Sequence, residues 1–358
     1  MRVALCPHIS VRHFRGGEKW VVELANRLAA DGVDVRVNAL PYLPDGERRV
    51  RVEDVLDGDV PYAEAWRHDL SGVDVAYLFY HPLCRLSFSG QGASVAGIHS
   101  WVYVSKRLYE RHYGVVPTAV KALYRTLGPL DLGGFDAVHA VTPAFDSPHP
   151  DTWYVPNFVD VERFHPGRAP TADRFTVLAT AAHIPEKGWD VVRTVASRLP
   201  DDVRLLATGS CEDPEVEDLG FLTEDELARA YARAHLVLHP ARVDTDSMVI
   251  NEACASGTPV LTTPIPTHVS ENAAVVHRNT VGGFLEAIET VRDEWDEGDG
   301  YDLRCRVARW EGETRDVEAV YPRLVRMFRA VADGERPGRG APVRWAGVDS
   351  PPPTEARE

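Results

Sequence analysis

The chain has 358 residues, of which 44% are apolar, so it can bury two hydrophobic cores and is neither a disordered nor a fibrous protein. Its 54 acidic residues outnumber 39 basic ones, and the net charge of −15 excludes a broad nucleic-acid-binding surface. The five cysteines form no C-x-x-C pair, which argues against a disulfide framework or a zinc site, and no apolar stretch is long enough to span a membrane.

Short β-branched runs alternate with segments of helical period along most of the chain. This alternation is typical of β-α-β units, so the sequence predicts an α/β fold with two successive doubly wound parallel-sheet domains. We expect strands at residues 2–6, 33–39, 74–80, 94–98, 136–141 and 152–155, and then at 175–180, 203–207, 235–239, 259–262 and 273–276. We expect helices at residues 17–31, 188–199, 223–233, 248–256, 281–294 and 314–333.

The domain boundary is expected where this periodicity is lost. Between residues 159 and 170 Pro and Gly cluster, as in an interdomain linker. The sequence therefore predicts an N-terminal Rossmann-like domain over residues 1–160 and a C-terminal one over residues 161–333. Residues 334–358 are rich in Pro, Gly and charge, and we expect a disordered tail there.

Two glycines, Gly16 and Gly17, stand where the first long helix begins. Small residues at a helix N-terminus let an anion approach backbone N–H groups at the positive end of the helix dipole, so a phosphate is one expectation and a tight turn without a ligand is the other. Neither G-x-G-x-x-G nor the P-loop pattern occurs here. A nicotinamide dehydrogenase and a P-loop nucleotidase therefore lose their main support.

Lys187 is one of only four lysines and lies on a Pro- and Gly-containing loop just before a predicted helix. An ammonium group there is well placed to neutralise a diphosphate, although a lone lysine of this kind is more often a surface charge.

A second loop, from Asp244 to Met248, follows the strand predicted at 235–239, and Glu252 lies about one turn into the next helix. Both carboxylates then face the strand ends, where ligands of open α/β sheets bind, and carboxylates accept hydrogen bonds from sugar hydroxyls. The simpler alternative for this loop is an ordinary helix N-cap by Asp246 or Ser247.

Five motifs in this order resemble the family 4 retaining glycosyltransferases. The resemblance covers about residues 1–330. The motifs are Arg15-Gly16-Gly17-Glu18, the Val155–Phe164 segment with its Pro-Asn pair, Pro185-Glu186-Lys187-Gly188, Leu219–Leu222 before a helix that begins Glu224-Asp225-Glu226-Leu227, and the acid-pair segment that ends Asn251-Glu252-Ala253.

This resemblance implies the GT-B fold, in which two Rossmann-like domains face each other across a cleft. It also implies transfer of a sugar from a nucleotide-diphosphate donor with retention of anomeric configuration, without a metal ion or another cofactor. Carried over by position, Glu252 would hold the ribose hydroxyls and Lys187 the diphosphate. The backbone at Gly16 and Gly17 would bind the phosphates from the N-terminal, acceptor-side domain.

The resemblance also implies which residues surround the transferred sugar. Asp244 takes the place of the first acid of the family's E-x7-E pattern, beside the donor sugar. Asp246, Ser247 and Met248 follow in the loop that covers sugar and phosphate. His99, which follows the strand predicted at 94–98, matches the family's histidine near the transferred sugar, although a lone histidine at a strand end is usually structural.

Three positions depart from the family pattern. Ala182 stands where the family usually has the arginine five residues before the lysine, Asp244 is one methylene shorter than the usual Glu, and Phe158 replaces a Gly. We expect Arg15 or Arg242 to supply the missing cation. A non-catalytic nucleotide-sugar-binding protein and an epimerase or hydrolase of the same fold are the alternatives to a transferase.

Residues 102–130 carry a local excess of positive charge inside an acidic protein, and residues 119–127 include an apolar helical face. Such a segment can dock on an anionic membrane that carries a lipid-linked glycan acceptor, or it can be an ordinary helix over the domain core. We expect the protein to be cytoplasmic, with a peripheral contact at the inner face of the cell membrane as a further hypothesis.

Overall fold

The computed structural model describes residues 1–43, 49–100, 115–145, 147–167, 174–209, 211, 213–265, 267–268 and 275–335. The described residues form two compact units: Asn157–Ala319 is the second, and Met1–Pro156 together with residues 320–335 is the first. The expected boundary after residue 160 is replaced by one after Pro156. The last helix, expected wholly in the second domain, packs its Phe328 ring 5.9 Å from that of Tyr77 in the first unit.

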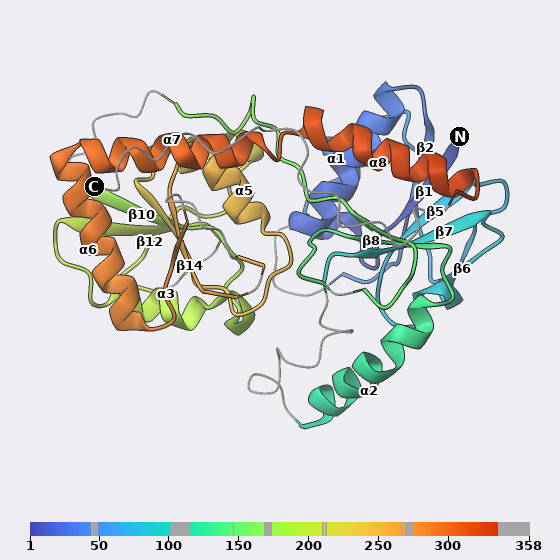
Figure 1. Ribbon diagram of the computed structural model, residues 1–358, viewed down its shortest axis with the longest axis horizontal. Helices are drawn as coiled ribbons and strands as arrows, with labels where there is room; N and C mark the ends of the chain where they lie inside the picture. The colour runs from blue at the N-terminus through green and yellow to red at the C-terminus, as the bar shows by residue number, and fades with distance from the viewer. Residues whose placement is uncertain are drawn as a thin grey trace. The chain divides into compact units, whose positions relative to one another are not determined.

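The first unit contains a parallel sheet of seven strands in the order β3-β2-β1-β5-β7-β8-β9 (Figure 1). The chain runs from β1 outward through β2 and β3 and then returns to β5 on the other side of β1, so the strand order reverses between β1 and β5. The strands are β1 (Arg2–Cys6), β2 (Asp34–Ala39), β3 (Tyr62–Glu64), β5 (Val75–Phe79), β7 (Ala93–Ile98), β8 (Ala137–Ala140) and β9 (Thr152–Tyr154). A separate pair joins β4 (His68–Asp69) and β6 (Phe88–Ser89).

Helices cover both faces of this sheet. On one face, Trp20 of α1 (Gly16–Ala30) and Phe328 of α8 (Val317–Ala332) contact Tyr77 of β5. On the other face, Leu132 of α2 (Val115–Leu132) is buried in a cluster with Leu78. Short 3-10 helices are η1 (Val11–His13), η2 (Val52–Asp54) and η3 (Cys84–Ser87).

The second unit repeats this design with a parallel sheet of six strands in the order β12-β11-β10-β13-β14-β15. Its strand order reverses between β10 and β13. The strands are β10 (Phe175–Ala179), β11 (Val203–Ala207), β12 (Glu217–Asp218), β13 (Leu236–His239), β14 (Val260–Thr262) and β15 (Val275–His277).

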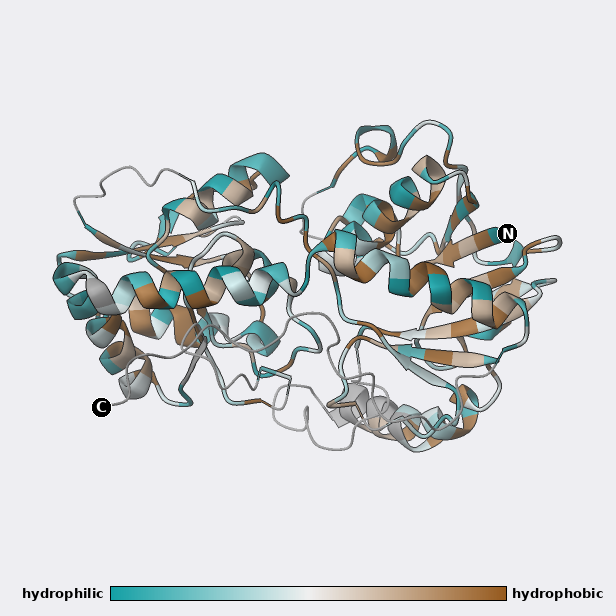
Figure 2. Cartoon of the chain, turned by 45° about the horizontal axis from the view of Figure 1, so that its top comes forward, coloured by the Kyte–Doolittle hydropathy of each residue, from teal (hydrophilic) through white to brown (hydrophobic). Residues whose placement is uncertain are grey.

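Alternate residues of the buried strands of the second unit face two different helix layers. Val177 and Leu238 pack with α3 (Trp189–Ala196) and α6 (Val281–Glu297), while Leu178 and Val237 pack with α4 (Glu224–Arg233), α5 (Met248–Ala255) and α7 (Asp299–Glu313). Figure 2 shows hydrophobic residues along the strands of both sheets and hydrophilic residues on the helices around them. The periodicity that predicted two doubly wound domains is therefore confirmed in each unit.

The helix α7 was not expected, and its sequence contains Gly300 and Gly312. The structure gives a packing reason for Gly312: a Cβ atom there would lie 2.3 Å from the backbone nitrogen of Ala255 in α5. The glycine therefore permits close packing of α7 on α5. The strand β12 also escaped notice, since it is only two exposed residues long.

The segment expected to be an interdomain linker is packed against the second unit as far as the structure describes it, to Gly167. Phe158, Val159 and Phe164 are each 1% exposed. Val159 exchanges backbone hydrogen bonds with Arg315 and Val317, both of 2.9 Å. The loss of periodicity that suggested an interdomain linker reflects irregular backbone that is held by buried side chains and hydrogen bonds of the second unit.

Several expectations fall on parts of the chain that lie outside the described residues. These are residues 102–114 of the basic segment, residues 168–170 of the expected linker and residues 336–358 of the expected tail. Among the helices that the structure describes, none has the length and apolar character that crossing a bilayer requires.

Candidate functional site

Several of the predicted site residues follow the carboxyl ends of strands at which the strand order reverses. At such a point adjacent loops diverge, and ligands of open α/β sheets bind there. In the second unit β10 leads to Lys187 and β13 leads to Asp244. In the first unit β1 leads to Gly16 and Gly17, and His99 directly follows β7.

Close contact between two loops brings Lys187 and Asp244 together. The 3-10 helix η5 (Pro185–Lys187) ends at Gly188, whose φ of +74° lies in the left-handed region that favours glycine. A Cβ atom at Gly188 would lie 2.1 Å from the carbonyl oxygen of Pro240, so only glycine lets the loop after β13 approach η5. The backbone N–H of Arg242 completes the contact by donating to the carbonyl oxygen of Glu186 at 2.9 Å.

Arg242, one of the two expected compensating cations, is engaged in this loop contact. Its guanidinium donates to both carboxylate oxygens of Asp190, at 2.6 and 2.7 Å, and to the carbonyl oxygen of Pro185 at 2.6 Å. Arg242 would have to leave this bidentate pair to reach a diphosphate. Its place in the structure is that of a clamp between the loop, η5 and α3.

Asp244 is at the centre of a polar network. Its Oδ2 atom lies 2.8 Å from His239 Nε2, 3.1 Å from Lys187 Nζ and 3.5 Å from His268 Nε2. Burial alone would raise the pKa of Asp244, but the Lys187 ammonium and the hydrogen bond from His239 hold it well below its usual range. Asp244 is therefore a fixed negative charge at the carboxyl end of β13.

His239 acts in this network as a neutral donor. Its side chain is fully buried, and burial lowers the pKa of His239 to about 4 despite the neighbouring carboxylate. The neutral ring donates Nε2–H to the Asp244 carboxylate. Sequence reasoning did not single out His239 or His268, because neither lies within the motifs that carried the resemblance.

These three residues also form a group that can be tested as a metal site. One ligand atom each from His239, Asp244 and His268 lie within 4.8 Å of one another, and nitrogen and carboxylate oxygen atoms are ligands that Zn²⁺ accepts. The Lys187 ammonium already contacts the shared Oδ2 atom, however, and its charge opposes a dication at the same oxygen. We interpret the group as a hydrogen-bonded support for Asp244, and the absence of a metal requirement stays a prediction.

Asp246 has a structural role that its motif did not reveal. Both of its carboxylate oxygens lie 2.7 Å from Arg315 Nη1, and its Oδ2 accepts the backbone N–H of Asn157 at 2.6 Å. Burial raises the pKa of Asp246, and the Arg315 charge opposes this shift. Asn157, from the Pro-Asn pair that suggested the family, therefore anchors the loop after β13 rather than contacting a ligand by this N–H.

The remaining residues of the acid-pair segment begin α5. Ser247 is its N-cap, accepting the backbone N–H of Ile250 at 3.4 Å, as the simpler sequence interpretation required, and Met248 is its first residue. Glu252 is 4% exposed one turn later. It lies beside Tyr231, whose pKa is raised well above its usual value first by burial and then by Glu252.

In the first unit, the start of α1 is compatible with a ligand. A Cβ atom at Gly17 would meet Phe79 at an ordinary 3.5 Å, so packing does not require glycine at this position. Gly16 and Arg15 are exposed. Glu18 accepts the backbone N–H of Arg15 at 3.3 Å, and burial raises the pKa of Glu18 to about 7.

His99 is held by aromatic side chains of the first unit. Its ring stacks on Phe79, with centroids 4.2 Å apart and planes 4° apart, and Trp20 lies 4.6 Å away. Its Nε2 atom lies 2.8 Å from the hydroxyl oxygen of Tyr77. Burial lowers the pKa of His99 well below its usual value, so the ring is neutral near pH 7.

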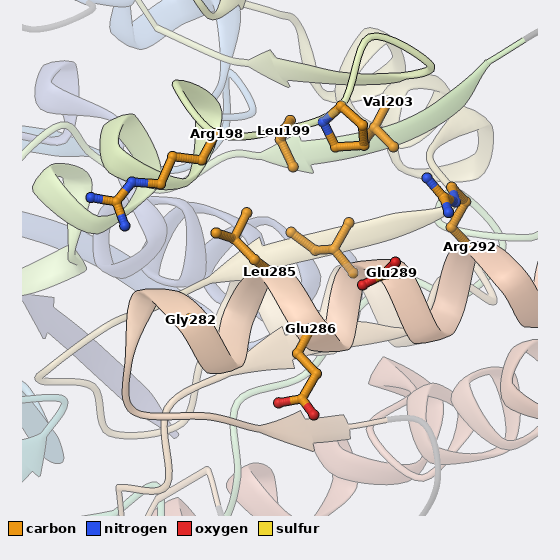
Figure 3. Close-up of a pocket in the computed structure, with 10 residues that line it drawn as sticks. Arg198, Leu199, Val203, Gly282, Leu285, Glu286, Glu289 and Arg292 are labelled. Atoms are coloured by element: carbon orange, nitrogen blue, oxygen red, sulfur yellow. The ribbon is translucent and has the colours of Figure 1, made fainter.

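A hollow of about 500 Å³ in the second unit lies away from this site. It is lined by the end of the α3 region, the start of β11 and α6 (Figure 3), with Leu199 and Leu285 pointing toward each other and Glu286 pointing away. Val203, where β11 begins, is among its lining residues. The hollow is thus at the amino edge of the sheet, opposite the strand ends that carry Lys187 and Asp244.

The sequence of the chain is similar to that of known glycosyltransferases. Residues 167–294 match a family model described as "Glycosyl transferases group 1". The GDP-mannose-dependent alpha-mannosyltransferase of Corynebacterium glutamicum is 26% identical in an alignment of 198 positions, which covers 48% of this chain and 46% of that protein. The aligned part of the chain therefore spans about half the length of this curated relative.

The fold of nearly the whole chain resembles that of several solved structures. Sucrose-phosphate synthase from Thermosynechococcus elongatus matches with a TM-score of 0.74 and 15% identity, over 94% of this chain and 100% of that chain. HepE from Anabaena, in complex with UDP and glucose, matches with a TM-score of 0.69 and 14% identity, over 91% and 99% of the two chains. The chain has the GT-B fold. The fold expected from the sequence is thereby confirmed.

Replacing Gly188 tests the loop contact. We expect Gly188→Ala to lower the free energy of unfolding by roughly 1–3 kcal/mol, because alanine is strained at this positive φ and its Cβ would strike Pro240. Urea unfolding followed by circular dichroism measures the change. Gly282→Ala is the matched control, since a Cβ there meets nothing within 4 Å, and equal stability of the two variants would contradict the analysis.

Buried histidines predict a loss of stability in mild acid. Burial lowers the pKa to about 4 for His8, His13, His139, His235 and His239. Since the unfolded chain binds these protons near pH 6.5, the free energy of unfolding should fall as the pH drops from about 6.5 to about 4.

One histidine is suited to measuring this slope. His235→Asn retains an acceptor for the backbone N–H of Thr176. Without His235, the protein should take up about one proton fewer on unfolding, so its free energy of unfolding should depend less steeply on pH. A slope that His235→Asn does not alter would contradict the assignment of a neutral buried ring.

Proposed function

We propose that this protein is a glycosyltransferase that moves a sugar from a nucleotide-diphosphate donor to an acceptor with retention of configuration. The observation that carries the proposal is the contact of Lys187 with Asp244, at the carboxyl ends of β10 and β13 within the segment that matches the glycosyltransferase model. The mannosyltransferase named for GDP-mannose and the HepE complex with UDP both support a nucleotide-bearing donor.

The charges of this network suit the departure of a diphosphate. Breaking a glycosidic bond develops positive charge on the anomeric carbon and negative charge on the leaving group. The Lys187 ammonium, partly exposed at 29%, would turn from Asp244 to the diphosphate, and Asp244 would remain as a negative charge for the oxocarbenium-like centre. Glu252 would bind the ribose hydroxyls, and no metal ion or other cofactor is part of the proposal.

The first unit supplies the remaining proposed contacts. The exposed backbone at Gly16 and the neighbouring Gly17 would bind phosphate, and Arg15, unlike Arg242, is not held in the loop clamp and is the better candidate for the second cation. His99 would contact the transferred sugar. Front-face attack, in which a donor phosphate oxygen takes the proton of the acceptor hydroxyl, would give retention.

A donor screen tests the proposal directly. UDP-, GDP- and ADP-sugars are added to the protein, and the cognate donor should raise its melting temperature, since a ligand at about 100 times its Kd adds about 2.7 kcal/mol to stability. Lys187→Met should weaken donor binding about tenfold or more, because it removes a charged hydrogen-bond donor.

The control for Lys187→Met is Arg193→Met. Arg193 is an exposed cation that pairs with Asp213 outside the Asp244 network, so this variant should bind the donor like the unaltered protein. Stabilisation by none of the sugar nucleotides would refute donor binding. Binding with hydrolysis of the donor, or with no transfer over an acceptor panel, would refute the transferase, and an inverted product anomer would refute retention.

The acceptor side includes a proposed contact with an anionic membrane through α2. Leu123, Leu127 and Leu130 are 56%, 44% and 78% exposed and recur on one face of this helix. The sequence of the same helix also contains Lys121 and Arg125. An exposed apolar stripe in a helix whose sequence also contains basic residues is typical of helices that bind the surface of anionic bilayers, where a lipid-linked glycan would be available.

Liposome flotation tests this contact. The protein should float with vesicles that contain anionic lipid at low salt and less at high salt, because the basic residues are screened. Replacing Leu123, Leu127 and Leu130 together by Ser should abolish flotation, whereas Phe221→Ser, an exposed apolar position of the second unit, should not. No flotation even at low salt would remove the membrane contact from the proposal.

A further inference from the structure

A series of side-chain hydrogen bonds crosses three neighbouring strands of the first unit and ends at His99. Tyr77 lies on β5 and His139 on β8, with β7 between them in the sheet. The Tyr77 hydroxyl passes over β7 at Gly97, where a Cβ atom would lie 2.3 Å from the hydroxyl oxygen. Gly97 therefore opens the path by which Tyr77 reaches His139 Nδ1 at 2.6 Å and His99 Nε2 at 2.8 Å.

The far end of this series of hydrogen bonds fixes the position of each proton. His139 Nε2 lies 2.7 Å from the carbonyl oxygen of Val155, which only accepts, so Nε2 carries a proton. Burial lowers the pKa of His139 to about 4, so the ring is neutral and its Nδ1 accepts. Because Tyr77 has a single hydroxyl proton and donates it to His139 Nδ1, its oxygen accepts Nε2–H of His99.

This proton order selects one tautomer of His99. A neutral imidazole with its proton on Nε2 carries its lone pair on Nδ1. We propose that Tyr77 and His139 are positioning residues that fix the tautomer of His99, so that His99 presents Nδ1 as an acceptor to a hydroxyl group of the sugar substrate. The inference rests on the proposed function, because the sugar is the ligand that supplies this hydroxyl.

The surroundings of this series of hydrogen bonds suit a positioning role. Tyr77 and His139 are both fully buried, and the stacking of His99 on Phe79 fixes the plane of its ring. With ring plane and proton both set before the substrate binds, neither has to reorganise during the reaction. The other tautomer would offer an Nδ1–H donor, which cannot accept the proton of a sugar hydroxyl.

The tautomer can be read without an activity assay. In protein labelled with ¹⁵N-histidine, long-range ¹H–¹⁵N spectra at pH 7 should show His99 and His139 with the proton on Nε2. Tyr77→Phe should shift His99 toward the Nδ1–H form, because its Nε2–H loses its acceptor. Tyr80→Phe is the matched control, since this buried tyrosine donates to the backbone of Gly128 instead, and it should leave His99 unchanged.

Kinetics then test the role in the reaction. Tyr77→Phe should lower kcat for sugar transfer about tenfold, the effect of one lost hydrogen bond, with a smaller change in KM for the donor. His139→Asn keeps an acceptor near the position of Nδ1 and should retain most of the activity, whereas His139→Leu should behave like Tyr77→Phe. Circular dichroism of each variant identifies any loss of folding.

The outcomes separate this inference from the proposed function. The inference is overturned if His99 of the unaltered protein carries its proton on Nδ1. It is also overturned if Tyr77→Phe leaves the tautomer of His99 unchanged. A shifted tautomer with a kcat equal to that of Tyr80→Phe also overturns it. If the tautomers are as expected but no sugar nucleotide is turned over, the series of hydrogen bonds is supported and the proposed function fails.

Discussion

The candidate site depends on the close approach of two loops at the edge of the second sheet. With glycine at position 188, the loop after β13 packs directly on η5, and this contact places the ammonium of Lys187 3.1 Å from the Asp244 carboxylate. His239, at the end of β13, donates a hydrogen bond to the same carboxylate. Opposite charges are thus fixed side by side at strand ends where the fold leaves room for a ligand.

Much of this fold could be predicted from the sequence. The strands of both sheets are short and apolar, and their alternation with amphipathic helices leaves few topologies to consider. The helix α7 could not be predicted in the same way, because Gly312 looks like a helix breaker until the backbone of Ala255 is seen against it. The packing of Phe158 and Phe164 likewise depends on contacts distant in sequence.

Part of the geometry of the candidate site could also be predicted from the sequence. The motifs pointed to Lys187 and Asp244, which the structure brings together. They did not reveal that Asp246 is bound by Arg315, 69 residues away, or that Arg242 is clamped by Asp190, 52 residues away. Ion pairs of such sequence separation leave no local pattern, and a charged residue within a motif can be part of the scaffold.

The chain passes from the first unit to the second at Asn157 and returns to the first at Val320. This limits where the protein can be cut into fragments that fold. Residues 320–335 belong with the first unit, where Leu324 and Phe328 are fully buried. A fragment that stops at Pro156 would leave the apolar surface under Phe328 open to water and invite aggregation. An N-terminal half that remains in solution therefore has to carry the last helix as a fused or separately added peptide.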